Sequence, residues 1–176
     1  MLIERLDFLL PYGVRRLTEE DGDDIFGLQR KHAVCHAMYT TREIDMDYVL
    51  GDLTSVPDGR SLADKFYLGV YDGDRLVAIV DVVLGFPLPK TAWLGMIMVD
   101  AGLTGQGIGG RILEALKHAL YRENIIELYT AVPVKCRAEG FFDAHGFGTG
   151  DVEKLGTRED GTDITGRIRG VSTAAG

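Results

Sequence analysis

The chain has 176 residues, 45% of them hydrophobic and 26% charged, which suits one globular domain with a sizeable core. Its formal net charge is −8 and no run of Lys and Arg exceeds two residues, which argues against a protein that binds nucleic acid. No apolar run reaches the roughly 18 to 20 residues that span a bilayer, and the N-terminus lacks the basic region of a signal peptide. We therefore expect a cytoplasmic protein with no membrane partner.

The N-terminal part of the sequence predicts one strand and two helices. Residues 1–10 form either a short helix or an extended arm. Alternation over residues 12–17 indicates a first strand, and Thr18 is a suitable N-cap for a helix that continues to Tyr39. A second and weaker helical pattern covers residues 43–53.

Three consecutive strands follow, at residues 66–71, 75–84 and 91–100. The turn Asp72-Gly73-Asp74 joins the first two, and a loop at residues 85–90 with two prolines precedes the third. Short connections of this kind predict an antiparallel meander.

A helix that ends near Asn124 comes next, and residues 125–132 form a strand. This strand should run parallel to residues 91–100, because a whole helix separates the two. A short helix at residues 136–145 is ended by Gly146.

Residues 147–155 and 164–171 predict a final hairpin, and residues 172–176 are expected to be a disordered tail. No repeat or second domain is visible, so residues 1–176 should form a single domain. The element order is β, α, α, β, β, β, α, β, α, β, β. It predicts an α+β fold with a mixed, mostly antiparallel sheet.

The most informative stretch, residues 93–120, reads as a strand, a glycine-rich turn and an amphipathic helix. Glycines let the backbone approach an anion, and the first N–H groups of a helix attract one. The alternative is a tight structural turn without a ligand. The glycines of the turn are Gly105, Gly107, Gly109 and Gly110.

Residues 105–110 also fit the dinucleotide pattern G-x-G-x-x-G. That pattern calls for an acidic residue at the end of the second strand, whereas Glu127 opens the next strand here. A Walker A loop is excluded, because no Lys-Ser/Thr pair follows the glycines. A dinucleotide-binding protein therefore stays an alternative.

Residues 99–109, VDAGLTGQGIG, resemble the acetyl-CoA loop of the GNAT superfamily of N-acetyltransferases, V-x-P-x-Y-R/Q-G-x-G-I-G. One departure is Thr104 at the Arg/Gln position. The resemblance implies a GNAT-like sheet with helices on both faces, and backbone N–H groups that hold the CoA pyrophosphate. The implied contacts to acetyl-CoA are Met98, Val99, Thr104, Gly105, Gln106, Gly107, Ile108, Gly109, Gly110, Lys135 and Phe142.

Residues 135–147 resemble a second segment of that superfamily, N-x-x-A-x-x-F-Y-E-x-x-G-F. Lys135 stands at the Asn position, and Phe142 stands where many members have the Tyr that protonates the leaving thiolate. Phenylalanine has no proton to give. The thiolate could leave unassisted or take a proton from water, or another group could supply it. The candidate acids are Cys136, Tyr129 and His145, and a protein that only binds acyl-CoA is a further alternative.

Acetyl transfer to an amine also needs a base and a donor to the thioester carbonyl. Asp81, in the apolar run LVAIVDVVL, is the candidate base, unless it faces solvent or pairs with an Arg. The resemblance implies that the donor is the backbone N–H of Val99. His32 and His36 share one helix face. The resemblance implies that this helix flanks the acceptor pocket, so the two histidines could line it, and the alternative is an ordinary polar face of an amphipathic helix.

Cys35 and Cys136 have unrelated surroundings and are interpreted as free thiols, and no spacing indicates a metal site. The resulting hypothesis is an acetyl-CoA-dependent N-acetyltransferase. It would move an acetyl group to a primary amine of a small molecule or peptide, by direct attack in a ternary complex. A homodimer stays open, because dimers are common in the superfamily.

Overall fold

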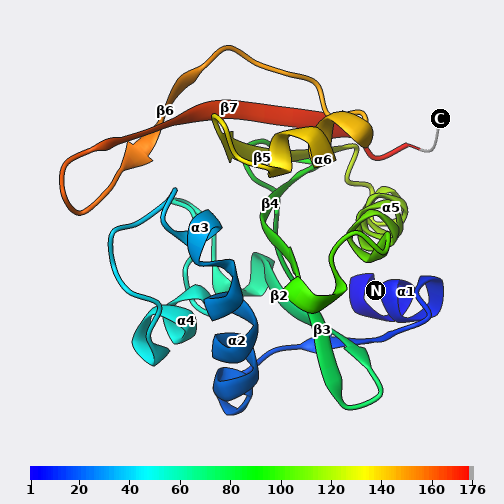
Figure 1. Cartoon of the computed structure of the whole chain (residues 1–176). Helices are drawn as coiled ribbons and strands as arrows, with labels where there is room; N and C mark the ends of the chain where they lie inside the picture. Colours follow the sequence, from blue (N-terminus) through cyan, green and yellow to red (C-terminus); the bar gives the residue numbers. More distant parts are fainter. Residues whose placement is uncertain (175–176) are drawn as a thin grey trace.

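The structure, a computed structural model, describes residues 1–174 (Figure 1). The helices are α1 (Leu2–Leu9), α2 (Gly22–Gln29), α3 (Ala33–His36), α4 (Met46–Asp52), α5 (Ile108–Arg122) and α6 (Ala138–Ala144), with 3₁₀ turns η1 (Glu19–Asp21), η2 (Arg30–His32), η3 (Leu62–Asp64) and η4 (Ala101–Leu103). The strands are β1 (Gly13–Arg16), β2 (Lys65–Asp72), β3 (Arg75–Leu84), β4 (Thr91–Val99), β5 (Glu127–Pro133), β6 (Glu153–Thr157) and β7 (Asp163–Ser172).

The strands form one sheet in the order β1-β2-β3-β4-β5-β7-β6. Every neighbouring pair is antiparallel except β4 and β5, which are parallel. Helices α1 and α5 lie on one side of the sheet, and α2, α3 and α4 lie on the other (Figure 1). The predicted α+β fold, with a mixed, mostly antiparallel sheet and helices on both faces, is confirmed.

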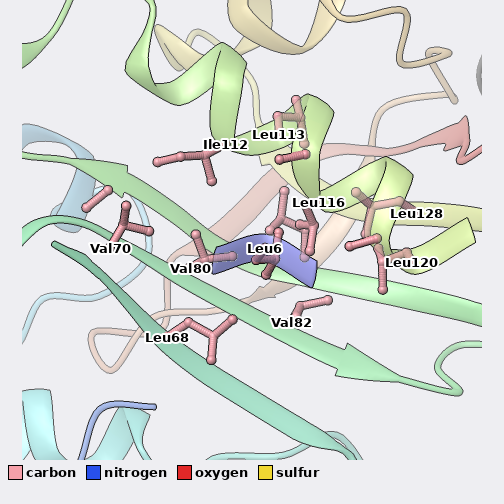
Figure 2. Packing of buried hydrophobic residues seen from close by; sticks show 14 of the residues in the cluster. Leu6, Leu68, Val70, Val80, Val82, Ile112, Leu113, Leu116, Leu120 and Leu128 are labelled. Carbon is pink, nitrogen blue, oxygen red and sulfur yellow. The ribbon is translucent and has the colours of Figure 1, made fainter. Parts of the chain in front are cut away.

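Helix α1 is part of the main core, so residues 1–10 are a helix and not an extended arm. Figure 2 shows Leu6 of α1 beside Val80 and Val82 of β3 and Leu116 of α5, and all four are buried. Burial of one such side chain stabilises the fold by roughly 1.5 to 3 kcal/mol. A smaller core on the opposite face joins α2 and α4 to the sheet through Ile25, Leu28, Val49, Tyr67 and Ile79.

The predicted continuous helix from Thr18 to Tyr39 is wrong, because the segment is broken into η1, α2, η2 and α3. The break at His32 (φ −110°, ψ 36°) coincides with bonds from this segment to the end of β4. The second predicted helix, residues 43–53, is shorter and forms α4.

Two predictions near the C-terminus are also corrected. Residues 147–152 are not a strand, although the N–H of Gly148 still donates to Gly170 O at 2.8 Å. The tail begins later than expected, because Ser172 belongs to β7 and Thr173 is buried with its hydroxyl donating to Ile125 O at 2.5 Å. Residues 175–176 lie outside the described part of the chain.

Within residues 1–174, no helix combines the length and the apolar character that a membrane crossing requires.

Candidate functional site

Strands β4 and β5 diverge soon after they begin. Only residues 91–93 pair with residues 127–129, and the Thr130 hydroxyl then donates to Leu94 O at 2.8 Å. Beyond this point residues 94–99 of β4 and residues 130–132 of β5 line one cleft of about 1710 Å³. The gap leaves backbone groups of β4 without a neighbouring strand.

The backbone of Val99 is directed into this gap. The N–H of Asp100 donates to Val77 O of β3 at 2.8 Å. Successive strand residues direct their N–H and C=O groups to opposite sides, so Val99 directs both of its groups away from β3. His32 Nε2 lies 2.8 Å from Val99 O, which agrees with that direction. The N–H of Val99 therefore faces the cleft.

A β-bulge at Gly95 brings the Asp81 carboxylate against β4. The register of β3 and β4 shifts between Asp81 and Val82, and a Cβ atom at position 95 would lie 2.9 Å from Asp81 Oδ2. Lys65 Nζ is 2.8 Å from both carboxylate oxygens, and the Lys65 side chain is only 3% exposed. Burial raises the pKa of Asp81, and the Lys65 ammonium opposes part of that rise. Asp81 thus lines the cleft as an ion-paired carboxylate, with a lysine as its partner.

A second carboxylate, that of Asp52, lines the cleft close to Asp81. Gln29 Nε2 donates to Asp52 Oδ2 and to the hydroxyl of Tyr67, both at 3.0 Å. Burial raises the pKa of Asp52, and its negative charge contributes to the raised pKa of Asp81. The sequence analysis did not identify Asp52, because Gln29 and Asp52 occupy polar positions that are ordinary in two amphipathic helices.

The glycine-rich turn forms the other end of the cleft. Gly105 and Gly107 have φ of 79°, the left-handed region, and Gly107 is the N-cap of α5 without a capping side chain. A Cβ atom at either position would meet nothing within 4 Å, so the requirement is for backbone conformation and not for space. The first N–H groups of this 15-residue helix have no partner inside the helix and no capping side chain, and residues 107–110 line the cleft.

Most of the predicted cofactor contacts line this one cleft, and so does Asp81. Gln106 and Lys135 do not. Gln106 is exposed within the turn, and Lys135 is exposed at φ 63° with its N–H donating to Glu139 Oε2 at 3.2 Å. The predicted contacts that do line it are Met98, Val99, Thr104, Gly105, Gly107, Ile108, Gly109, Gly110 and Phe142.

Cys136, a predicted acid, is buried beside Cys35 and does not line the cleft. The neighbouring Cys35 thiol lowers the pKa of Cys136, and the N–H of Ala138 acts in the same direction. The neighbouring Cys136 sulfur and burial raise the pKa of Cys35. Because Cys136 does not line the cleft, its role as the acid stays a prediction. Both cysteines are free, as expected.

The other two candidate acids are also engaged. The hydroxyl of Tyr129 donates to Glu127 Oε2 at 2.9 Å, and Tyr129 does not line the cleft. His145, which directly follows α6, does line the cleft. Its Nδ1 lies 3.0 Å from Oε1 of Glu114 on α5. Phe142 is buried with its ring centroid 4.9 Å from that of Phe147.

His32 and His36 both line the cleft but have different partners. His32 contacts the backbone of Val99, whereas His36 Nε2 lies 2.6 Å from Arg42 O. Among residues 1–174, no three His, Cys, Asp or Glu side chains are grouped so that they could hold a metal ion.

A diverging parallel strand pair, a glycine-rich turn and an uncapped helix N-terminus thus meet in one cleft. The model of the Acetyltransferase (GNAT) family matches residues 29–147, which include all of these features. The chain belongs to the GNAT acetyltransferase family. It is therefore an acyltransferase, and the GNAT family uses acetyl-CoA.

Solved GNAT structures share the fold along nearly the whole chain. An acetyltransferase from Thermus thermophilus is 20% identical with a TM-score of 0.71, over 93% of this chain and 98% of that one. The PaiA N-acetyltransferase of Thermoplasma acidophilum, in complex with coenzyme A, is 15% identical with a TM-score of 0.65, over 93% of this chain and 99% of that one. The ribosomal-protein-S18-alanine N-acetyltransferase of Escherichia coli is 15% identical with a TM-score of 0.65, over 94% of this chain and 96% of that one. No curated protein matches the chain.

Two arginines that sequence reasoning missed line the cleft of this GNAT protein. Arg111 follows the glycines on α5, and Arg137 precedes α6, and both line the cleft. Arg111 lies two residues after the first motif and Arg137 lies within the second, and these positions were the available signal. Exposed arginines at this end add to the positive potential of the α5 N-terminus.

Proposed function

We propose that this protein is an acetyl-CoA-dependent N-acetyltransferase whose acceptor is a primary amine of a small molecule or peptide. Attack is direct, with both substrates bound in one ternary complex. The observation that carries the proposal is that the free edge of β4 and the uncapped N-terminus of α5 line the same cleft in a GNAT chain.

The residues present fit CoA. Backbone N–H groups from Gly107 to Gly109 and the side chains of Arg111 and Arg137 match a pyrophosphate and further phosphate. The gap between β4 and β5 matches an extended chain with amide groups, because Val99 offers it a backbone donor, while its carbonyl oxygen is bound by His32 Nε2. Acetyl-CoA supplies the activated acetyl group as a thioester.

Asp81 is the proposed base that receives the first proton, the one that turns an ammonium acceptor into the neutral amine. Burial raises its proton affinity, and the nearby Asp52 charge favours a cation at this end of the cleft. Val99 N–H stabilises the negative charge that develops on the thioester oxygen.

The first test is a measurement of thermal stability with CoA, acetyl-CoA and NAD. A ligand at about 100 times its dissociation constant should stabilise the fold by roughly 2.7 kcal/mol. We expect CoA and acetyl-CoA to raise the melting temperature and NAD to leave it unchanged. Stabilisation by NAD alone would replace the proposal with a dinucleotide-binding function. If CoA binds, release of free thiol across a panel of amines identifies the acceptor.

Two glycines provide a matched pair of variants. Gly107 and Gly59 both have φ of 79° and open space around them, but only Gly107 lines the cleft. Gly107→Ala and Gly59→Ala therefore impose similar backbone strain. We expect Gly107→Ala to weaken CoA binding at least about tenfold and Gly59→Ala to leave it unchanged, since removal of well-placed donors costs about 1.5 to 3 kcal/mol. Equal affinities in the two variants would show that the turn does not bind CoA.

A further inference from the structure

His32 is held where β4 opens into the cleft. Its Nε2 is 2.8 Å from Val99 O, and the ring lines the cleft while half-buried. The preceding residue fixes the same point, because Lys31 Nζ bonds to Asp100 Oδ2 at 2.8 Å. Asp100 is itself buried and accepts the N–H of Gly102 at 2.8 Å. Two consecutive side chains thus tie the η2–α3 break to the last residues of β4.

The bond to Val99 sets the state of the imidazole. A carbonyl oxygen can only accept, so His32 Nε2 carries the hydrogen. In the neutral ring Nδ1 then has a free lone pair, and no hydrogen bond within residues 1–174 engages it. Histidines that transfer protons are commonly oriented in this way, with one ring nitrogen donating to a fixed acceptor and the other free to act as the base.

We propose that His32 is the proton shuttle of this enzyme, the group that carries the second amine proton to the departing sulfur. The inference rests on the proposed function. Nδ1 takes the proton from the amine nitrogen as the nitrogen–carbon bond forms, and gives it to sulfur as the carbon–sulfur bond breaks. The thioester and the neutral amine become an amide and a thiol, and His32 ends in its starting state.

This assignment explains how the site functions with Phe142. One imidazole acts first as base and then as acid, so a separate Tyr donor is not required. Asp81, beside Gly95 on the β3 side of β4, receives the first proton of the acceptor, whereas His32 contacts the Val99 carbonyl, which points away from β3.

The test compares His32→Gln with His32→Ala. Gln keeps an N–H that can donate to Val99 O but cannot shuttle a proton, so it isolates the chemical role from the structural one. We expect His32→Gln to lower kcat at least about a hundredfold, because general acid–base catalysis contributes about 10² to 10⁴. The CoA affinity, measured by thermal shift, should change by less than about threefold. Added imidazole should restore part of the activity of His32→Ala.

A second measurement does not depend on turnover. Long-range ¹H–¹⁵N NMR correlations of the wild-type protein should show His32 with hydrogen on Nε2, the signal being assigned by its loss in His32→Gln. Hydrogen on Nδ1 would overturn the proposal. So would a kcat of His32→Gln close to that of the wild type, or a loss in His32→Ala that imidazole does not relieve. Failure of the wild-type protein to bind CoA would instead overturn the proposed function, and this inference with it.

Discussion

The ion pair between Arg15 and Asp21 links the edge strand β1 to the start of α2. Arg15 Nη2 is 2.6 Å from Asp21 Oδ1, and Nη1 is 2.9 Å from Oδ2. The Arg15 guanidinium lowers the pKa of Asp21 to about 2. A lowered pKa in the folded state stabilises the fold above the ordinary aspartate range, and this contribution is lost as the pH falls toward 2.

We expect Asp21→Asn to lower the free energy of unfolding by about 1 kcal/mol near neutral pH, allowing for solvent screening at the half-exposed Arg15. The difference from the wild type should shrink as the pH falls from about 5 to 2.5. Urea unfolding at several pH values measures it, and Asp23→Asn on the same helix is the control. A difference that is the same at every pH would show that the ion pair is not its source.

At the scale of single elements, the bulge in β4 places Gly95, which has no side chain, against Asp81 of β3. A Cβ atom there would lie 2.9 Å from Asp81 Oδ2, and Asp81 cannot move freely because Lys65 holds both of its oxygens. Gly95→Ala should therefore lower the stability by about 1 to 3 kcal/mol, the usual effect of overpacking. It should also lower kcat, because it displaces the proposed base.

A double-mutant cycle with Asp81→Ala isolates this contact. With the carboxylate removed, the nearest remaining atom of residue 81 is its Cβ at 3.8 Å, an ordinary van der Waals contact, so Gly95→Ala should have little effect in that background. Unfolding by denaturant gives the four free energies. Additive effects would mean that the cost comes from the backbone of the bulge and not from Asp81.

Elements with a clear local pattern could be predicted from the sequence, and those set by distant contacts could not. The apolar stretches of β2, β3 and β4 between short turns, and the apolar face of α5, were sufficient to place them. The break at His32 depends on bonds to residues 99 and 100, which are far away in the sequence. The same limit holds at the site. The glycine turn and Asp81 are visible as local patterns, whereas the partner of Asp81 is a lysine 16 residues earlier that only strand register identifies.

At the scale of the whole molecule, the tip of the β6–β7 hairpin is fastened to the loop after α3. Glu159 accepts from the hydroxyl of Thr40 at 2.5 Å and from the N–H of Thr41 at 2.8 Å. Arg158 Nη2 donates to Met38 O at 2.9 Å. Figure 1 shows this hairpin reaching past β5 toward the α3–α4 loop.

Glu159→Ala should release the loop from the hairpin. We expect faster hydrogen exchange of the amides at residues 38–42 and 158–162, with no change in β3, because the lost bonds are local to the tip. Glu153→Ala, at the exposed start of β6, is the control. Unchanged exchange at residues 38–42 would show that other contacts hold the loop.

The short pairing of β4 with β5 has a mechanical consequence. Three residue pairs, the Thr130 hydroxyl and the bond from Ile126 N–H to Lys90 O link strands β1 to β4 directly to strands β5, β7 and β6. A substrate whose extended chain lies in the gap between β4 and β5 would occupy the place of a strand and bridge the two parts of the sheet. Under the proposed function, binding of acetyl-CoA would therefore also hold the two parts of the sheet together and make the enzyme stiffer.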